Sequence, residues 1–419
     1  MIIGSGHKEG VLPDTEVRDL CREAVAGLDL AGKRVLALLP DATRRAPVGL
    51  MFRTLSGLLA RRASRLDFLI ALGTHRPMSD AQILKHLELT PHERGNRYAR
   101  IGLFNHVWDD PAALATLGTI AAAEMDRLTD GRMAQDVPVA LNRRLGDYDH
   151  IFLVGPTFPH EVVGFSGGHK YLFPGIAGPD IINAFHWLGA LVTNWHTNGI
   201  KDTAVRRVID RAAEFVRLPI TSFNMVVTRK GLKGLYIGDP KEAFSAAADL
   251  SAQVHIRYMD RRFKRVLGVA ATLYEDLWTA GKVMYKLEPI LSDGGELVIY
   301  APHVSEVSFT HGRHLDRIGY HCLDYFLAQM DRFADVPGAV LAHSTHVAGL
   351  GTFKGGVETP RIRVTLATGI PEERCRRVNL GYLDPRSIRA AEWIGREADG
   401  ILMVDQAGEV LHRLRPEAR

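Results

Sequence analysis

Short apolar segments alternate with helical patterns through the first half of the sequence. Four apolar runs lie at 33–40, 66–73, 149–156 and 223–229. Helical spacing occurs at 16–28, 48–63, 79–89 and 202–217. Ser79 and Gln82 have the spacing of a capping box. Strands that are apolar throughout are typical of a parallel sheet covered by helices on both faces. The pattern therefore predicts an α/β fold with a largely parallel sheet.

The second half predicts another α/β unit. Strand-like apolar runs lie at 295–302, 338–345, 361–368 and 400–406. The stretch 243–287 has a mostly helical pattern, and we expect it to link the two halves. We place the boundary near residue 265, which gives an N-terminal domain at 1–265 and a C-terminal domain at 266–419.

Composition and charge exclude several classes of protein. The 419 residues carry 52 basic and 48 acidic side chains, and the three cysteines form no CxxC pair. The densest basic cluster, at 59–65, lies in a helical pattern, which favours a solvated face over a nucleic-acid site. No apolar run has the length of a membrane span, and the N-terminus lacks a signal-peptide pattern. We expect a cytoplasmic protein that binds neither nucleic acid nor membrane.

Polar residues follow three of the predicted strands directly. The first strand runs into DATRR at 41–45, the second into GTHRP at 73–77 and the third into TFPHE at 157–161. Ligands of open α/β sheets bind outside the carboxyl ends of the strands. We therefore expect the catalytic or binding groups at this edge of the sheet.

A glycine-rich loop, GFSGGHKYLFPGIAG, follows the third strand at 164–178 and contains Lys170. It lacks the spacing of a phosphate-binding P-loop and of a dinucleotide-binding GxGxxG motif. Ser166 lacks the glycine spacing of a nucleophile elbow, so a serine hydrolase is disfavoured. Pro179, at the start of a helical pattern, leaves a weak signal for an anion site at a helix N-terminus.

Histidines are frequent in the first half of the chain, but no HExxH motif is present. They stand at His75, His160, His169, His186 and His196. A neutral imidazole is a good ligand for nickel, copper or zinc, although a single histidine is more often an ordinary core or surface residue. This pattern alone leaves a metal-dependent hydrolase open.

The motifs taken together resemble the lactate racemase family over nearly the whole chain. They are PDATR, GTHRPM, FPHEVVGFSGGHKYLFPGIAG, TAGKV and RIRVTLATGIPEERCRRVNLGYLDP, in this order. The resemblance implies a nickel-pincer nucleotide, the Ni(II) complex of pyridinium-3,5-bisthiocarboxylate mononucleotide. It also implies that Lys170 anchors this cofactor through a thioamide and that His186 is a metal ligand, where Ni(II) takes four donors in a plane.

The resemblance assigns the remaining site residues as well. It implies that Asp41, Ala42, Thr43 and Arg44 bind the cofactor phosphate, with Arg44 also near the substrate carboxylate. It implies catalytic roles for His75 and His160, and it places Lys282 on the substrate carboxylate. Lactate racemase itself is similar here but has a glutamine in place of Thr279 and a tyrosine in place of Trp278. These two substrate-binding positions favour an acid larger than lactate.

The implied function is an isomerase, a racemase or epimerase that inverts C2 of a 2-hydroxy acid. Hydride would pass reversibly to the cofactor while the two histidines act as acid and base. The N-terminal domain would bind the cofactor, the C-terminal domain would contribute substrate contacts, and the active site would occupy the cleft between them. Proteins that make the cofactor are expected partners, and a homo-oligomer is left open. Two alternatives are a metal-dependent hydrolase and a non-catalytic protein that binds a nucleotide or cofactor.

Overall fold

Packing divides the chain into two compact units in the computed structural model, which describes residues 2–416. Unit 1 contains the residues up to 158 together with 165–185 and 201–254. Unit 2 contains 159–164, 186–200 and the residues from 255 onward. The domain boundary near residue 265 stays a prediction.

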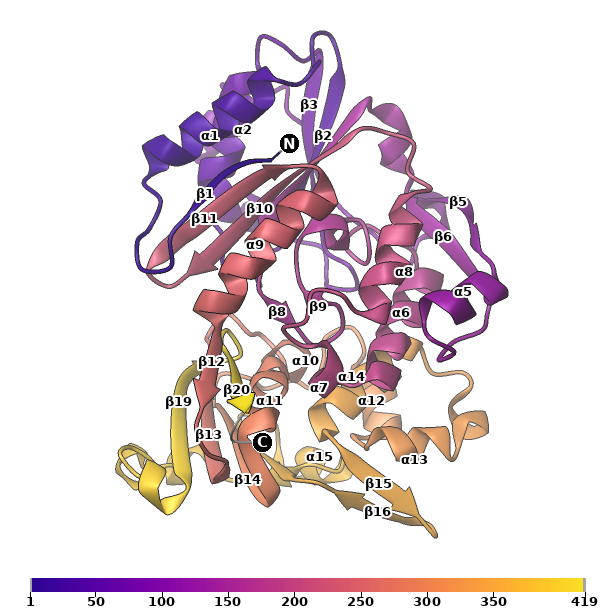
Figure 1. Ribbon diagram of the computed structural model, residues 1–419, viewed down its shortest axis with the longest axis vertical. Coiled ribbons are helices and arrows are strands. Elements are labelled where there is room, and N and C mark those ends of the chain that lie inside the picture. The colour runs from indigo at the N-terminus through magenta and orange to yellow at the C-terminus, as the bar shows by residue number, and fades with distance from the viewer. Residues whose placement is uncertain (1, 417–419) are drawn as a thin grey trace. The chain divides into compact units, whose positions relative to one another are not determined.

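Unit 1 is built on a seven-stranded sheet (Figure 1). Its strands are β1 (Ile3–Gly6), β2 (Arg34–Pro40), β3 (Arg65–Ala71), β4 (Leu103–Asn105), β7 (His150–Pro156), β10 (Ile220–Thr228) and β11 (Gly231–Gly238), in the order β1-β11-β10-β7-β2-β3-β4. The strands from β10 to β4 are parallel, and β11 and β1 add an antiparallel edge. The prediction of an α/β fold with a largely parallel sheet is confirmed.

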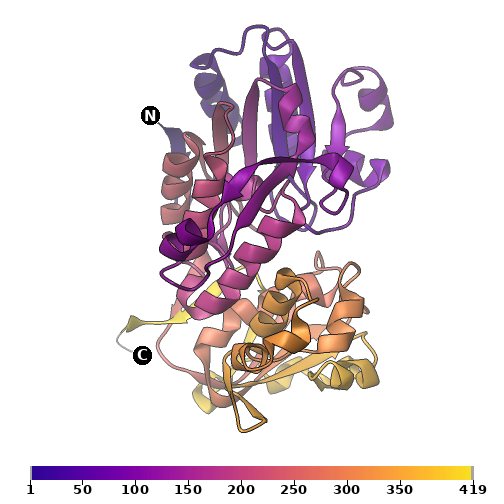
Figure 2. The same ribbon diagram turned by 90° about the vertical axis from the view of Figure 1, so that its right-hand side faces the viewer.

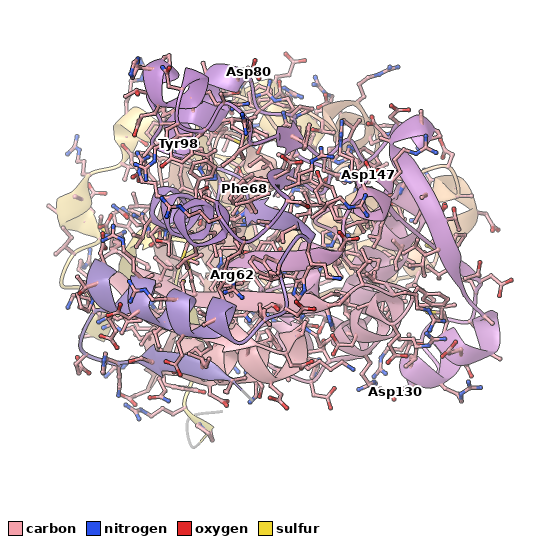
Figure 3. All side chains as sticks on the ribbon, turned by 90° about the horizontal axis from the view of Figure 1, so that it is seen from above. Arg62, Phe68, Asp80, Tyr98, Asp130 and Asp147 are labelled. Carbon is pink, nitrogen blue, oxygen red and sulfur yellow. The ribbon has the colours of Figure 1, made fainter. Side chains whose placement is uncertain are left out.

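Helices cover both faces of this sheet. On one face, α1 (Asp14–Ala26) and α2 (Val48–Leu59) enclose a core that includes Phe68. On the other face, α9 (Pro240–His255) packs Ala247 and Leu250 against Val226 of β10. Figure 3 shows Phe68 among crowded interior side chains, whereas Asp80 and Asp130 lie toward the periphery.

The predicted capping box stands at the start of α3 (Asp80–His86). The backbone N–H of Gln82 donates to Ser79 Oγ at 3.3 Å, and the backbone N–H of Ser79 donates to Gln82 Oε1 at 2.8 Å. The other helices that begin in unit 1 are α4 (Pro91–Gly95), α5 (Ala122–Leu128), α6 (Pro179–Val192), which ends in unit 2, and α8 (Ala204–Ala213). Its 3-10 helices are η1 (Pro111–Ala113), η2 (Arg143–Asp147) and η3 (Gly168–Tyr171).

A two-stranded ribbon adds to unit 1 and was not expected from the sequence. It consists of β5 (Leu114–Ile120) and β6 (Val137–Asn142), which pair antiparallel and carry α5 at their turn (Figures 1 and 2). Arg211 of α8 forms an ion pair with Glu124 of α5, with 2.6 Å between Nε and Oε1. The ribbon is thereby fixed to α8. The two-residue strands β8 (Pro159–His160) and β9 (Gly164–Phe165) flank the start of that loop.

Unit 2 is built on a five-stranded parallel sheet. Its strands are β13 (Phe263–Ala270), β14 (Leu291–Ala301), β17 (Arg363–Thr368), β18 (Gly381–Tyr382) and β19 (Ile401–Ala407), in the order β18-β17-β14-β13-β19. Two smaller pairs are β12 (Ile256–Met259) with β20 (Leu411–Leu414) and β15 (Gly351–Lys354) with β16 (Val357–Pro360). A second α/β unit, as predicted, therefore exists.

The helices of unit 2 are short apart from α14. They are α7 (Asn194–Thr197), α10 (Leu277–Ala280), α11 (Lys282–Leu287), α12 (Gly312–Ile318), α13 (Leu323–Leu327), α14 (Gly338–Ala348) and α15 (Glu372–Arg377). The 3-10 helices are η4 (Glu288–Ile290), η5 (Met330–Phe333), η6 (Pro385–Ser387), η7 (Ala390–Glu392) and η8 (Glu397–Asp399). Within residues 2–416 no helix combines the length and hydropathy that a membrane crossing requires.

One sequence-based expectation for this half is wrong, and a second misses two strands. The run 338–345, expected as a strand, lies in helix α14, which is buried on nearly every side. A short apolar run of this kind has no periodicity that separates a buried strand from a buried helix. The stretch 243–287, expected to be mostly helical, contains β12 and also β13, which pairs with both β14 and β19. Four basic residues precede or open β13 and hide its apolar strand pattern in the sequence. They are Arg261, Arg262, Lys264 and Arg265.

Candidate active site

The carboxyl ends of β2 and β3 bring Asp41 and His75 together. The two strands are parallel neighbours, so the residues that follow them emerge at the same edge of the sheet. The His75 Nδ1–H donates a hydrogen bond to the buried Asp41 carboxylate. Since a carboxylate can only accept, this contact places the proton of a neutral His75 on Nδ1 and leaves the lone pair on Nε2.

Asp41 is ionised in this setting. Burial opposes its ionisation, but the charge of His75, its hydrogen bond and the charge of Arg44 outweigh burial and hold the pKa of Asp41 well below its usual value. Thr43 adds two donors to Asp41 Oδ1, the backbone N–H at 3.1 Å and Oγ1 at 2.7 Å. Asp41 therefore both orients His75 and closes the turn at 41–43.

Arg44 lies in the same strand-end loop and offers a hydrogen-bond donor to a ligand. Its guanidinium is 5.7 Å from the centre of the Phe158 ring, and its Nη1 is buried without a hydrogen-bond partner in the described part of the chain. Buried guanidinium groups normally pair with a carboxylate or phosphate. The loop thus fits an anionic group, whereas Ala42 is exposed and Thr43 turns its hydroxyl toward Asp41.

The glycine-rich loop that carries Lys170 is held by the core of unit 1. Gly167 and Gly168 have φ of 97° and 58°, and a Cβ at Gly167 would overlap Thr157 Oγ1 and lie 2.9 Å from Asn224 Oδ1. The Gly168 N–H donates to Asn224 Oδ1 at 2.8 Å. Buried Arg206 of α8 donates to the carbonyls of Gly167 and Phe165. Lys170 therefore projects from a backbone that its own protein neighbours fix.

His169, to which the sequence assigns no role, is hydrogen-bonded within unit 1. Its Nδ1 is 2.7 Å from Asp210 Oδ1 of α8, and the His169 side chain is buried. This pair fixes the residue next to Lys170 to α8. The local sequence carries no signal for it, because the partners are 41 residues apart.

His160 lies in unit 2, and its hydrogen bonds differ from those of His75. The backbone N–H of Val162 donates to His160 Nδ1 at 3.2 Å, and Glu161 Oε2 is 3.5 Å from the same nitrogen. A backbone N–H can only donate, so a neutral His160 carries its proton on Nε2. The two candidate catalytic histidines are thus held in opposite tautomers.

The substrate residues expected from the sequence lie on α10 and α11 in unit 2. Buried Lys282 has its Nζ 4.7 Å from the centre of the Tyr274 ring. The Thr279 Oγ1 donates to Asp276 Oδ1 at 2.9 Å, and the Thr279 N–H donates to the same atom at 3.0 Å. Thr279 therefore completes the N-terminal cap of α10, a structural role that its hydrogen bonds show directly.

Aromatic and imidazole rings gather around Trp278, and the sequence reasoning missed this cluster. The Trp278 ring centre is 4.5 Å from that of His311 and 4.2 Å from that of His343. Burial, followed by the charges of His346, His311 and His186, lowers the pKa of His343 well below 6.5. His186 of α6 therefore lies within electrostatic reach of His343. The spacing of His343 and His346 in an apolar run was the signal that could have identified a helix with both rings on one face.

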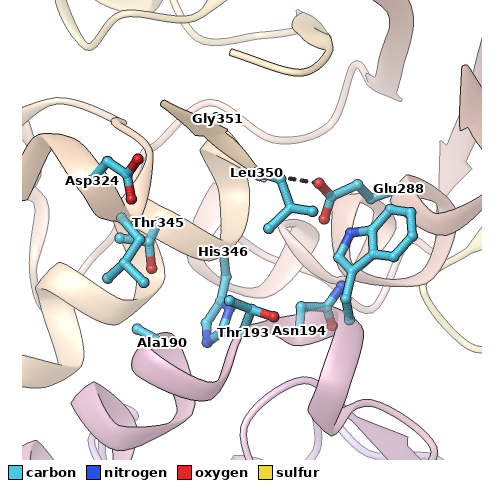
Figure 4. Close-up of a pocket in the computed structure, with 12 residues that line it drawn as sticks. Ala190, Thr193, Asn194, Glu288, Asp324, Thr345, His346, Leu350 and Gly351 are labelled. Carbon is cyan, nitrogen blue, oxygen red and sulfur yellow. Dashed lines mark hydrogen bonds between the residues drawn. The ribbon is translucent and has the colours of Figure 1, made fainter. Parts of the chain in front are cut away.

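Unit 2 contains a pocket of about 100 Å³ (Figure 4). Two of its lining residues are close in sequence to histidines described above. Its lining includes Ala190, four residues after His186 on α6, and His346, three residues after His343 on α14. Two further lining residues are joined by a hydrogen bond, in which the Leu350 N–H donates to Glu288 Oε1 at 2.8 Å. Burial lowers the pKa of His346 to about 4, so this imidazole is neutral at neutral pH.

The described residues bring some of the expected groups into contact. Asp41, Thr43, Arg44 and His75 form one cluster in unit 1, and Trp278 and Lys282 share a helical segment in unit 2. Across 2–416, no three histidine, cysteine or carboxylate side chains gather closely enough to hold a metal ion by themselves. A metal site made of several protein ligands, as the hydrolase alternative requires, gains no support from this arrangement.

Comparison with known proteins identifies the family. The family model of the lactate racemase N-terminal domain matches residues 20–198. A crystal structure of a Thermotoga maritima protein superposes with a TM-score of 0.89 and 34% identity, covering 96% of this chain and 99% of that one. The lactate racemase apoprotein from Thermoanaerobacterium thermosaccharolyticum shares the fold, with a TM-score of 0.72, 16% identity and coverage of 99% and 100%. A search of curated proteins gave no match. Residues 20–198 therefore belong to the lactate racemase N-terminal domain family, and the chain as a whole has the lactate racemase fold.

Proposed function

We propose that this protein is a racemase or epimerase that inverts C2 of a 2-hydroxy acid larger than lactate. The observation that carries the proposal is the cluster at the ends of β2 and β3. There an ionised Asp41 orients His75, and Arg44 keeps a buried donor for an anion. A base and a cation at one sheet edge are the groups that deprotonation of a hydroxy acid requires.

The residues of the chain fit the nickel cofactor that the family uses. The buried Arg44 Nη1 suits a phosphate or carboxylate oxygen, and Lys170 projects from a fixed loop. We assign Lys170 as the thioamide anchor, residues 41–44 as the phosphate loop and His186 as the protein ligand of nickel. When bound, the cofactor supplies an acceptor for hydride, which a protein side chain cannot provide.

The two histidines divide the proton transfers between them. His75 presents the Nε2 lone pair and takes the hydroxyl proton from one enantiomer, and Asp41 stabilises the imidazolium that forms. We assign His160 to the other enantiomer. Its neutral ring carries the proton on Nε2, so this proton must first move to Nδ1, where Glu161 at 3.5 Å accepts it in place of the contact with Val162. Nε2 can then take the hydroxyl proton. We assign Arg44 and Lys282 to the substrate carboxylate.

The preference for a larger acid follows from Trp278 and Thr279. The Thr279 hydroxyl is used within its own helical cap, so it does not reach out as a longer amide side chain would. Trp278 is partly exposed and offers an aromatic surface to a carbon chain.

A peptide mass map of protein co-produced with the cofactor-making proteins tests the proposal. We expect a nucleotide-sized adduct on the Lys170 peptide, absent from Lys170→Ala, together with interconversion of the C2 configurations of a 2-hydroxy acid. Lys241→Ala changes an exposed lysine of α9 and serves as the matched control, which should keep both adduct and activity. Adduct without interconversion of any 2-hydroxy acid would favour the non-catalytic binding alternative, and zinc without adduct would favour the hydrolase.

A further inference from the structure

Helices α10 and α11 place Trp278 and Lys282 on one helical face. Gly281 joins the two short helices with φ of −52° and ψ of −21°, so the helical path continues through it. Side chains four residues apart in such a segment are neighbours. Trp278 therefore stands beside Lys282, the residue that we assign to the substrate carboxylate.

Two buried imidazoles hold the Trp278 indole. The planes of His311 and His343 are inclined to it by 39° and 32°, at centre distances of 4.5 and 4.2 Å, which are tilted ring contacts. Both imidazoles are buried, whereas Trp278 is partly exposed. Trp278 thus contacts both buried rings while part of its side chain stays exposed and accessible to a ligand.

His343 is itself fixed at both ring nitrogens. Tyr285 Oη is 2.8 Å from Nδ1, and Tyr320 Oη is 3.3 Å from Nε2. Burial raises the pKa of both tyrosines well above 10, so one hydroxyl donates and the other accepts across a neutral imidazole. A Cβ at Gly281 would lie 2.7 Å from Tyr285 Oη and 3.2 Å from His343 Cε1, so glycine makes room for this contact.

The charges near this cluster disfavour a second anionic group on the ligand. Asp276 accepts hydrogen bonds from Thr279, the residue after Trp278, at 3.0 and 2.9 Å. Burial, followed by the charges of Glu161, Tyr320 and Asp276, raises the pKa of Tyr285, in keeping with a negative charge in this region. Lys282 supplies a cation for one carboxylate, and the tyrosines and His343 are neutral. The partly exposed Trp278 indole offers an uncharged aromatic surface, which suits an uncharged chain.

We infer that His343 is a positioning residue that fixes the Trp278 indole beside Lys282, and that this face selects 2-hydroxy acids with one carboxylate and an uncharged chain. The inference rests on the proposed function, because it names the substrate class of the same site. His343 acts through Trp278 and does not touch the reacting atoms.

Steady-state kinetics of the adduct-bearing protein with three substrates test the inference. They are lactate, an unbranched six-carbon sugar acid and the four-carbon dicarboxylate malate. We expect wild-type kcat/KM to be highest for the sugar acid. His343→Ala should raise KM for the sugar acid about tenfold, the worth of a lost aromatic contact, while kcat and the KM for lactate stay within twofold. His343→Phe keeps a flat ring against the indole and should restore part of the loss.

The matched control is His346→Ala, which removes a second buried histidine from the same helix. It should lower the melting temperature as much as His343→Ala without changing the ratio of KM values. An equal change for all three substrates, the same change in His346→Ala, or a wild-type preference for malate would overturn the inference and leave the proposed function standing. Adduct-bearing wild type that converts none of the three acids or any other 2-hydroxy acid would overturn both.

Discussion

The contact between Asp41 and His75 gives a quantitative prediction for Asp41→Asn. The amide has nearly the same size as the carboxylate but carries no charge, so it cannot stabilise a protonated His75 in the same way. Asp41 is only 5% exposed, and water cannot replace the lost charge. A hydrogen bond to a charged group contributes about 2 kcal/mol, which corresponds to a fall of ~30-fold in kcat.

The assay is the interconversion of both substrate configurations by adduct-bearing protein, followed by chiral chromatography. We expect kcat to fall ~30-fold while KM changes less than about threefold, because the lost interaction forms as the proton moves. Asp149→Asn is the matched control, because it also removes a carboxylate that is hydrogen-bonded to a cation, Arg34, but at the start of the strands. It should leave kcat unchanged. A kcat within threefold of wild type in Asp41→Asn, with the Lys170 adduct retained, would refute the assignment of Asp41 as the group that orients a base.

Three further predictions concern the stability of each unit. Gly167→Ala should lower the free energy of unfolding by about 3 kcal/mol, through backbone strain and overlap with Thr157. Gly131→Ala is also at positive φ but in open space, and it should lower the free energy of unfolding by about 1 kcal/mol. Chemical denaturation of the two variants compares them, and equal losses would contradict the packing argument. Arg206→Met should destabilise unit 1 by about 3 kcal/mol, because the loop carbonyls lose a buried donor; a melting temperature equal to wild type would contradict this. Burial lowers the pKa of His346 and His412 to about 4 from 6.5, so their stabilising contribution is complete above pH 6.5 and is lost as the pH falls toward 4. Protonation of each histidine should lower the free energy of unfolding by about 2 kcal/mol between pH 7 and pH 5. In thermal unfolding, His346→Gln should lose less stability over this pH range than wild type does.

The sheet of unit 1 and part of its strand-end cluster could be predicted from the sequence. Uninterrupted apolar runs identified β2, β3 and β7, and parallel strands deliver the residues that follow them to one edge. This rule alone is enough to expect Asp41 near His75. Their hydrogen bond, and the tautomer that it sets, needed coordinates, because edge position does not determine which side chains meet.

The sequence could not supply the cluster around Trp278. Its members come from α10, from the residue that precedes α12 and from α14, and they are up to 65 residues apart. The run 338–345, which carries His343, was expected as a strand that ends before His346, so the shared helical face of the two histidines was not recognised. The run was interpreted with the two-residue repeat of a strand, although it forms a helix. The one local sign that the two histidines share a packed surface was therefore lost.

The glycines around Lys170 have a physical cause within the protein itself. From the sequence alone, glycine at 164–178 could be explained by close approach of the backbone to a ligand. The structure gives Gly167 a reason within the protein, since positive φ and the proximity of Thr157 and Asn224 exclude a Cβ there. Arg206 and the His169–Asp210 pair fix the same loop to α8. A lysine on a loop held in this way is oriented by the fold, and binding of a cofactor need not pay the entropy of ordering it.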